Sequence, residues 1–597
     1  MQAILSPTLG FGTILFLTFF YFLSSKTRNE KKDHIYSYLI TSSLIVAVVA
    51  IVFFFNPFSK IALPASWTFL KSPIFTPVGT PIDLVLFLGF FVTYGFTQIF
   101  VKKAGFSRIL PSVIIALALI LSVYSLFRPL PRPAQRQATS VQPPVSIFSS
   151  LPPYSVSWNA SIETLKSFGP SKDLGEALIN IVKTPLFGVG LDNFSSIFTR
   201  AKTPAYNTTP LWNVNYTYSR SFILQLLAET GILGTAAFVL VILAMLRAVT
   251  ESRDIANKML GYYFIAAFIL FPVSVPLLFL FFIFLSQVSH AEETIRTIDL
   301  SDITPAYGGI FIVVLIFVGA ISFLSARSYT SEYYFKRSLD GFAKNNAKTV
   351  YDNMRLAVVM NPYIERFRIS FSQVNLLIAN NIAARTRPQK EGEKPKELTA
   401  QERQNITQAI QASIGEAKAA VALNPQRASN WENLAVIYRN IINAVQGANN
   451  WTIASYQRAI ALDPQNPALR FALGQTYYAL NDYENAVRMF ELSAGLKPDW
   501  PNARYNLAWS NYQKKDYGRA TTQMEAAVRI LSSNKNSPDL KKAKADLEDF
   551  KKKLAESTPA TAPGELALPT PPATKIDPKL QLNKQAEPPR EATPTAR

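Results

Sequence analysis

The stretch Asn466–Pro498, NPALRFALGQTYYALNDYENAVRMFELSAGLKP, decides the fold of the C-terminal half of the chain. Gly474 and Ala486 are small residues at positions where two consecutive helices have to approach each other. The aromatic ring of Phe490 fills the seam between these helices, and Pro498 ends the second one because proline cannot continue a helix. The stretch therefore predicts a pair of antiparallel helices joined by the short turn around "NDY".

The same pattern recurs before and after this stretch. Ala520 follows Ala486 by 34 residues. The preceding unit contains the aromatic residues Trp431 and Tyr438, as this unit contains Tyr477. This spacing resembles the tetratricopeptide repeat, whose helix pairs stack into a right-handed solenoid. The resemblance implies four or five units and a groove that takes a protein or peptide partner.

The repeat pattern sets the boundaries of the C-terminal half. We predict the solenoid at residues 327–532, with a charged insertion at 386–400 that we expect to be disordered. A capping helix is predicted at 533–557. The Pro-rich remainder, 558–597, lacks aromatic residues and is predicted to be a disordered tail.

Long uncharged runs fill the N-terminal half instead. A helix needs about 20 apolar residues to cross a membrane. Qualifying runs are Leu9–Ser24, Ile35–Phe55, Leu84–Val101, Ile109–Phe127, Phe222–Leu246 and Ala306–Leu324. The run Leu260–Ser289 has two prolines at its middle, which favour a hairpin over one kinked helix.

The predicted fold class is therefore all-α. A polytopic membrane domain of about seven or eight spans, four of them within residues 1–127 and the rest within 221–326, precedes the solenoid and the tail. Basic stretches after the first and third spans indicate cytoplasmic loops, which places the loop 128–220 outside. The chain is predicted to be an integral, multi-pass protein of the cytoplasmic (inner) membrane. If Leu260–Ser289 forms a hairpin, the solenoid is extracytoplasmic. If this run forms a single span, the solenoid is cytoplasmic.

Composition excludes several kinds of site. The chain has no cysteine, so it has no disulfide and no thiolate ligand, and we predict no metal and no cofactor. Its net charge of +20 is typical of polytopic membrane proteins, whose cytoplasmic loops collect Lys and Arg. The basic residues form no stripe with interleaved aromatics, so nucleic acid is not an expected partner. The lipid bilayer is an expected partner.

The stretch Ser219–Gly234, SRSFILQLLAETGILG, places a carboxylate within an apolar span. Gln225 and Glu229 are four residues apart and share one helix face. An ionisable group at membrane depth faces the bundle interior or a wet cavity and suggests a functional site. The alternative is that Glu229 ties two helices together. A second notable stretch, "PLFGVGLDNF", contains Gly188 and Gly190, which we expect to form a structural turn.

Together these two stretches resemble the C-terminal half of the O-antigen ligase and O-antigen polymerase superfamily, over roughly residues 155–324. The resemblance implies a membrane glycosyltransferase that uses polyprenyl-diphosphate-linked glycans in cell-envelope polysaccharide assembly. It also implies that Arg220, Arg200 and Lys202 hold the diphosphate. Glu229, or Asp192, would serve as the base.

The chain departs from this family at the catalytic position. The family's His-Asn pair falls on Arg220 and Ser221, and the chain's two histidines, His34 and His290, lie on or beside predicted cytoplasmic loops. Four spans precede the loop, about half the usual number. Two hypotheses follow: an active or degenerate glycosyltransferase, and a non-catalytic membrane-anchored scaffold that binds proteins through its repeats.

Overall fold

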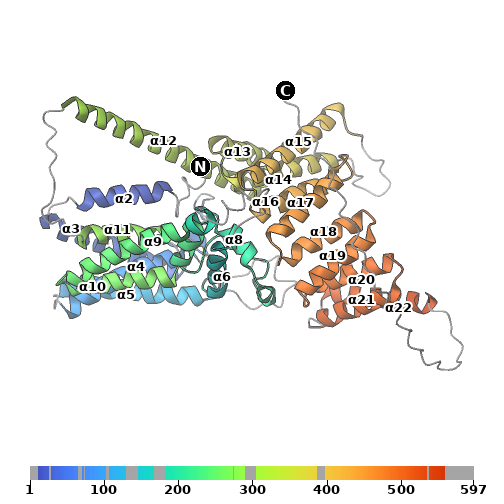
Figure 1. Ribbon diagram of the computed structural model, residues 1–597, viewed down its shortest axis with the longest axis horizontal. Coiled ribbons are helices and arrows are strands. Elements are labelled where there is room, and N and C mark those ends of the chain that lie inside the picture. The colour runs from blue at the N-terminus through green and yellow to red at the C-terminus, as the bar shows by residue number, and fades with distance from the viewer. Residues whose placement is uncertain are drawn as a thin grey trace, which may run out of the picture.

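A computed structural model describes residues 11–25, 29–64, 67, 70–72, 74–101, 106–129, 146–166, 183–272, 274–288, 304–385, 397–533 and 537–557. The described residues form a bundle of apolar helices at one end and a solenoid of helix pairs at the other (Figure 1). Short helices of the loop after α5 lie between the two parts. All regular elements among the described residues are helices, which confirms the predicted all-α fold.

The bundle consists of helices that run back and forth between two ends. They are α2 (Phe11–Ser25), α3 (Asn29–Phe54), α4 (Pro81–Phe100), α5 (Phe106–Phe127), α9 (Phe222–Glu251), α10 (Ile255–Leu270), α11 (Val275–Val288) and α12 (Thr304–Ala343). Four of them, α4, α5, α9 and α12, contain segments long and apolar enough to cross a membrane, fewer than the seven or eight expected. The other four have apolar segments of 10–17 residues within the part of the chain that the structure describes. Helix α3 begins at Asn29 and includes the charged residues 30–33, so His34 lies in a helix and not in the predicted loop.

Phenylalanine rings make the core of the bundle. Phe264 of α10 packs against Phe281 of α11 with ring centroids 5.3 Å apart, and Phe90 of α4 lies 5.5 Å from Phe264 on another side. Phe268 also meets Phe281, at 5.1 Å, so α10 and α11 pack side by side. The run Leu260–Ser289 is thus a hairpin of two helices, as its prolines indicate, and not one kinked helix.

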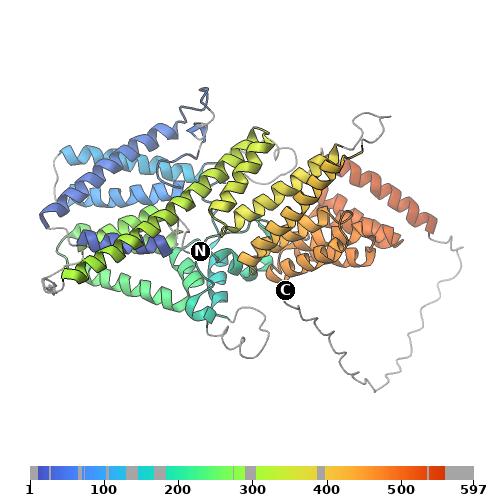
Figure 2. The same cartoon turned by 90° about the horizontal axis from the view of Figure 1, so that it is seen from above.

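Helix α12 joins the bundle to the solenoid without a break. Its apolar half is exposed at every residue from 311 to 320, and its polar half forms the first helix of the solenoid. The view from above shows α12 running from the far end of the bundle into the repeats (Figure 2).

The described residues of the solenoid form five helix pairs and a final helix. After the polar half of α12 come α13 (Ala347–Met360), α14 (Glu365–Ala384), α15 (Ala400–Leu423), α16 (Ala428–Asn440), α17 (Ala448–Leu462), α18 (Pro467–Ala479), α19 (Tyr483–Leu496), α20 (Pro501–Gln513), α21 (Tyr517–Leu531) and α22 (Pro538–Ser557). Asn466 caps the start of α18, and Asp482 and Asp516 cap the second helices of the last two pairs. Residues 386–396, within the predicted insertion, and the predicted tail 558–597 lie outside the described residues.

The predicted packing residues contact the cores of the pairs, except Pro498; Trp431 is partly buried against the cluster that contains Leu434 and Tyr438. Phe490, Ala486, Ala520 and Tyr438 are buried, and a Cβ on Gly474 would lie 2.8 Å from the Phe490 ring. Tyr477 is half-buried beside Phe490. Trp431 is only partly covered and donates from Nε1 to the Pro425 carbonyl at 2.9 Å, while Pro498 is exposed after the end of α19.

Candidate functional site at the junction of loop, bundle and solenoid

The glycine turn of the loop crosses α9 with backbone against backbone. Gly188 has φ of +72°, and a Cβ there would lie 2.3 Å from the carbonyl carbon of Glu229. Gly231 interrupts α9 with φ of +66°, and a Cβ there would lie 2.5 Å from the carbonyl carbon of Leu186. Only residues without a side chain allow this approach.

The interruption of α9 also supplies the hydrogen bonds that hold the turn. A break at Gly231 leaves nearby helix carbonyls without their usual partners. The Val189 amide donates to the Ala228 carbonyl at 3.1 Å, and the Gly190 amide donates to the Glu229 carbonyl at 2.9 Å. The two stretches singled out in the sequence therefore form one unit, although about 40 residues separate them.

The Glu229 carboxylate lies at the N-terminus of a helix in the loop. This helix, α8 (Phe194–Ala201), begins at Asn193, whose side chain provides no cap. Glu229 is 1% exposed, and its Oε1 accepts from the Phe194 amide and from Gln225 Nε2, both at 3.3 Å. Its Oε2 is buried with no hydrogen-bond partner among the described residues. A carboxylate at this position satisfies a free amide and interacts favourably with the helix dipole. These contacts explain why an apolar helix carries Gln225 and Glu229 on one face.

Arg220 lies against the base of the loop. Its backbone amide donates to Ser157 Oγ of α6 (Tyr154–Thr164) at 2.9 Å. Its guanidinium carbon is 4.3 Å from the centre of the Phe148 ring and 5.1 Å from that of Tyr154, a cation–π arrangement with two rings. Nη1 reaches the Phe148 carbonyl at 3.4 Å, while Nε is buried with no partner among the described residues.

Lys202 forms a buried ion pair with the solenoid. Its Nζ lies 2.8 Å from the carboxylate of Asp463, and both side chains are 1% exposed. Close by, Arg200 Nη2 donates to Gln426 Oε1 at 2.7 Å. Arg200 and Lys202, two of the three cations expected to bind a diphosphate, therefore contact the repeats instead.

Further contacts extend this interface along the solenoid. The Thr199 hydroxyl donates to the Leu462 carbonyl at 3.1 Å. Asn207, in the short 3-10 helix η3 (Pro204–Thr208), donates to the Gln465 carbonyl at 2.8 Å. In return, Arg427 Nη2 donates to the Asp192 carbonyl at 2.9 Å. Short polar contacts thus run along one edge of several repeats.

Three of the solenoid residues at this interface share one position in the repeat. Asn424, Asp463 and Lys497 each directly precede the proline that follows the second helix of a pair. Asn424 donates to Asn193 at 2.7 Å, Asp463 pairs with Lys202, and Lys497 donates to the Asn207 carbonyl at 2.7 Å. The loop therefore follows the edge of three successive repeats.

A small aromatic core keeps the loop in shape for this contact. Phe198 is fully buried, and its ring lies edge-on to Tyr206 at 5.7 Å and to Tyr216 at 5.5 Å. Burial raises the pKa of Tyr216 to about 12, so this hydroxyl stays protonated at physiological pH.

The predicted site residues do not meet in one cavity. Glu229 contacts the start of α8, Arg220 stacks on rings at the base of the loop, and Arg200 and Lys202 contact the solenoid. The described residues contain no group of three or more Asp, Glu, His or Cys side chains able to hold a metal ion. The site is therefore a junction of three parts of the chain.

Comparison with known families addresses the solenoid. A family model described as "TPR repeat" matches residues 446–481, and one described as "Tetratricopeptide repeat" matches residues 467–499. The solenoid is a tetratricopeptide repeat (TPR) domain. No curated protein matches the chain.

Solved structures similar to the TPR domain include three bacterial repeat proteins. MamA from Desulfovibrio magneticus is 11% identical over 35% of this chain and 98% of its own, with a TM-score of 0.26. A thermophilic TPR protein of Thermus thermophilus is 13% identical over 38% and 99%, with a TM-score of 0.25. A TPR protein of Parabacteroides merdae is 15% identical over 38% and 76%, with a TM-score of 0.28.

Proposed function

We propose that the protein is a membrane-anchored scaffold whose TPR domain binds a protein partner beside the outer end of the helical bundle. The observation that carries this proposal is the ion pair of Lys202 with Asp463. A lysine fully buried in a contact within the chain is not free to hold a ligand, and breaking the pair would leave an unpaired charge inside the protein. The loop acts as a support for the repeats.

In this proposal the shorter apolar helices also cross the membrane. Helices α2, α3, α10 and α11 run alongside the longer ones within the same bundle (Figure 1), which gives eight crossings and an integral protein of the bacterial inner membrane. The loop and the TPR domain contact each other, so they share one side. Basic loops at the other end make that side extracytoplasmic.

A protease added to intact spheroplasts tests this topology. It should cleave the TPR domain near its C-terminus, whereas a tag on the segment between α9 and α10 should survive until the membrane is opened. Complete protection of the TPR domain would place it in the cytoplasm and overturn this part of the proposal.

The partner is expected on the inner layer of the solenoid. First helices of successive pairs contact each other, as α14 contacts α16 and α18 contacts α20, and these helices form the concave surface of a repeat stack. A photo-crosslinking residue at exposed Gln475 of α18 should therefore capture a partner. The matched position is Glu491, exposed on the second helix of the same pair, where we expect no adduct. Equal capture at both positions would contradict groove binding.

A second candidate function is glycosyl transfer from a polyprenyl-diphosphate-linked glycan. It is supported by the close contact of the glycine turn with α9, the two elements on which the family resemblance depends. It is also supported by the unpaired Nε of Arg220 among the described residues. Arg220→Ala should then abolish glycan transfer in cells while membrane insertion is retained. Transfer at the wild-type level would rule out this role for Arg220.

A further inference from the structure

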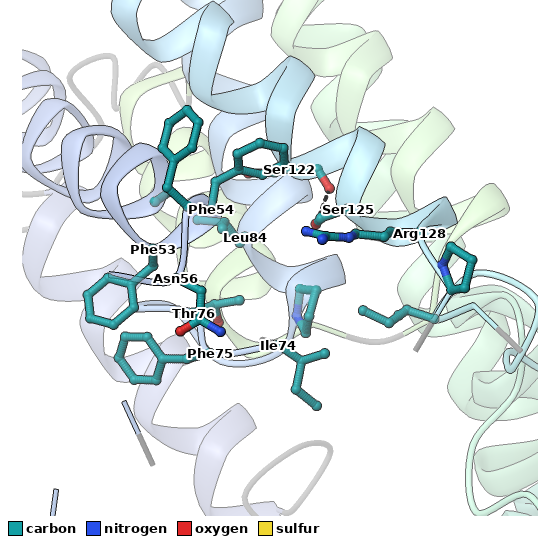
Figure 3. Close-up of a pocket in the computed structure, with 15 residues that line it drawn as sticks. Phe53, Phe54, Asn56, Ile74, Phe75, Thr76, Leu84, Ser122, Ser125 and Arg128 are labelled. Atoms are coloured by element: carbon teal, nitrogen blue, oxygen red, sulfur yellow. Dashed lines mark hydrogen bonds between the residues drawn. The ribbon is translucent and has the colours of Figure 1, made fainter. Parts of the chain in front are cut away.

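A cavity of about 500 Å³ lies at the outer end of the bundle, beside the base of the loop. It is lined by the end of α3, residues 74–76 of the segment that follows, the start of α4 and the end of α5, together with Ile147 at the base of the loop (Figure 3). Cavities of this size accommodate small ligands or part of a larger one. None of the residues assigned to the candidate site lines it.

The inner wall of the cavity is aromatic. Phe53 lies 4.5 Å from Phe75, ring centre to ring centre, and Phe54 and Leu84 cover a neighbouring face (Figure 3). Phenylalanine rings carry no polar atom, so this wall is purely apolar. The wall therefore suits the upper part of an acyl chain.

The rim of the cavity carries one cation and no carboxylate among its described lining residues. Arg128 follows the last residue of α5, and its guanidinium extends toward Ser125 and the middle of the cavity (Figure 3). Within the part of the chain that the structure describes, no ion pair is formed by Arg128. Arg128 is exposed at the rim, and a guanidinium with no carboxylate among the described lining residues attracts an anionic group, for which a phosphate offers a matching bidentate geometry.

A buried acceptor provides a second requirement. Asn56 adopts φ of +48°, a left-handed conformation that suits a residue just after the end of α3 and before Pro57. Its Oδ1 is buried with no hydrogen-bond partner among the described residues. Since a buried acceptor without a partner costs free energy, the cavity favours a ligand that also brings a hydroxyl donor.

We infer that this cavity binds an anionic glycerophospholipid of the outer leaflet whose head group carries free hydroxyls, as in phosphatidylglycerol. Arg128 holds the phosphodiester, Asn56 Oδ1 accepts from the glycerol head group, and the phenylalanine wall covers the first carbons of an acyl chain. The inference relies on the proposed membrane insertion but not on any partner of the TPR domain.

The test uses the full-length protein in nanodiscs of phosphatidylcholine that contain a minor fraction of phosphatidylglycerol or phosphatidic acid. Native mass spectrometry then measures which lipid stays bound. The wild type should retain phosphatidylglycerol in preference to both other lipids. Arg128→Gln should weaken retention about tenfold, which corresponds to about 1.4 kcal/mol.

Two further variants separate the contributions. Asn56→Gly preserves the left-handed backbone and removes the acceptor, so it should abolish the preference for phosphatidylglycerol over phosphatidic acid. Arg253→Gln removes an arginine just after the opposite end of α9 and should change nothing.

The outcomes distinguish this inference from membrane insertion itself. Failure of the protein to enter nanodiscs would contradict the proposed insertion and therefore the lipid site too. Normal entry with equal retention of all three lipids, or with an unchanged preference in Arg128→Gln, would overturn the lipid site alone.

Discussion

Replacing Lys202 with methionine removes one partner of the buried ion pair between the loop and the TPR domain. The substitution keeps much of the apolar stem and deletes the charge, so Asp463 remains buried without its cation. Breaking a buried pair in this way costs about 3–5 kcal/mol. The ratio of undocked to docked molecules should therefore rise by a factor of about 10² to 5 × 10³.

The absence of cysteine from the chain makes docking simple to measure. Spin labels on Thr208→Cys in the loop and Leu492→Cys in α19 report the distance between loop and solenoid, and neither position is buried. We expect one narrow distance distribution in the wild type. Lys202→Met should add a second, broader population.

The pH dependence of this defect has a definite sign. Burial raises the pKa of Asp463, and Lys202 is the strongest group that opposes the rise. In Lys202→Met the pKa of Asp463 should therefore rise further. A carboxyl group whose pKa is raised on docking binds more protons in the docked form, so docking is favoured at low pH and weakens as pH rises through the docked pKa. The excess undocking of the variant should be large at about pH 8 and small near the ordinary pKa of Asp, about 3.9.

The double variant Lys202→Met with Asp463→Leu serves as the control. Replacing both members of a buried pair with apolar residues is often close to neutral, so most of the docking should return. The reasoning is refuted if the double variant is as undocked as the single one, or if the defect of the single variant is the same at both pH values.

Three other substitutions test the packing of the junction and the repeats. Gly188→Ala should separate the glycine turn from α9, because its Cβ would overlap the Glu229 backbone; faster amide exchange at the turn would reveal this, and wild-type exchange would contradict it. Glu229→Leu should speed hydrogen exchange of the amides at the start of α8, because the Phe194 amide loses its acceptor. Glu229→Gln keeps an oxygen at this position, so it should change the exchange rate much less. Phe490→Ala should destabilise the TPR domain by about 3–5 kcal/mol, seen as a lower denaturation midpoint of the repeats; a shift below about 1 kcal/mol would mean that the seam closes around the gap.

The helix pairs could be predicted because their signal is local and repeated. Gly474, Ala486 and Phe490 lie within one unit, and each of them packs against its own pair. Span length was less predictable. The prolines indicated the turn between Leu270 and Val275, but the two helices that it separates have only 16 and 14 residues, fewer than the roughly 20 that a membrane crossing needs.

The site was only partly predictable, because its partners come from distant parts of the chain. The sequence indicated that Glu229 is buried, yet nothing near it indicates the start of α8 as its partner. Lys202 was expected to meet an anionic ligand, and it meets Asp463 instead, 261 residues away. The repeats carried one signal: Asp463 and Lys497 are charged at the position directly before the proline that follows the second helix of a pair. The structure buries both residues.

Helix α12 is a continuous connection between the bundle and the repeats. At 40 residues it is a rod about 60 Å long, fixed at one end among the repeats and running beside the bundle toward its opposite end. The loop clamps the middle repeats independently of this rod. We expect that force applied by a partner to the far repeats would pass through the loop to the start of α9, close to the interruption of this helix at Gly231.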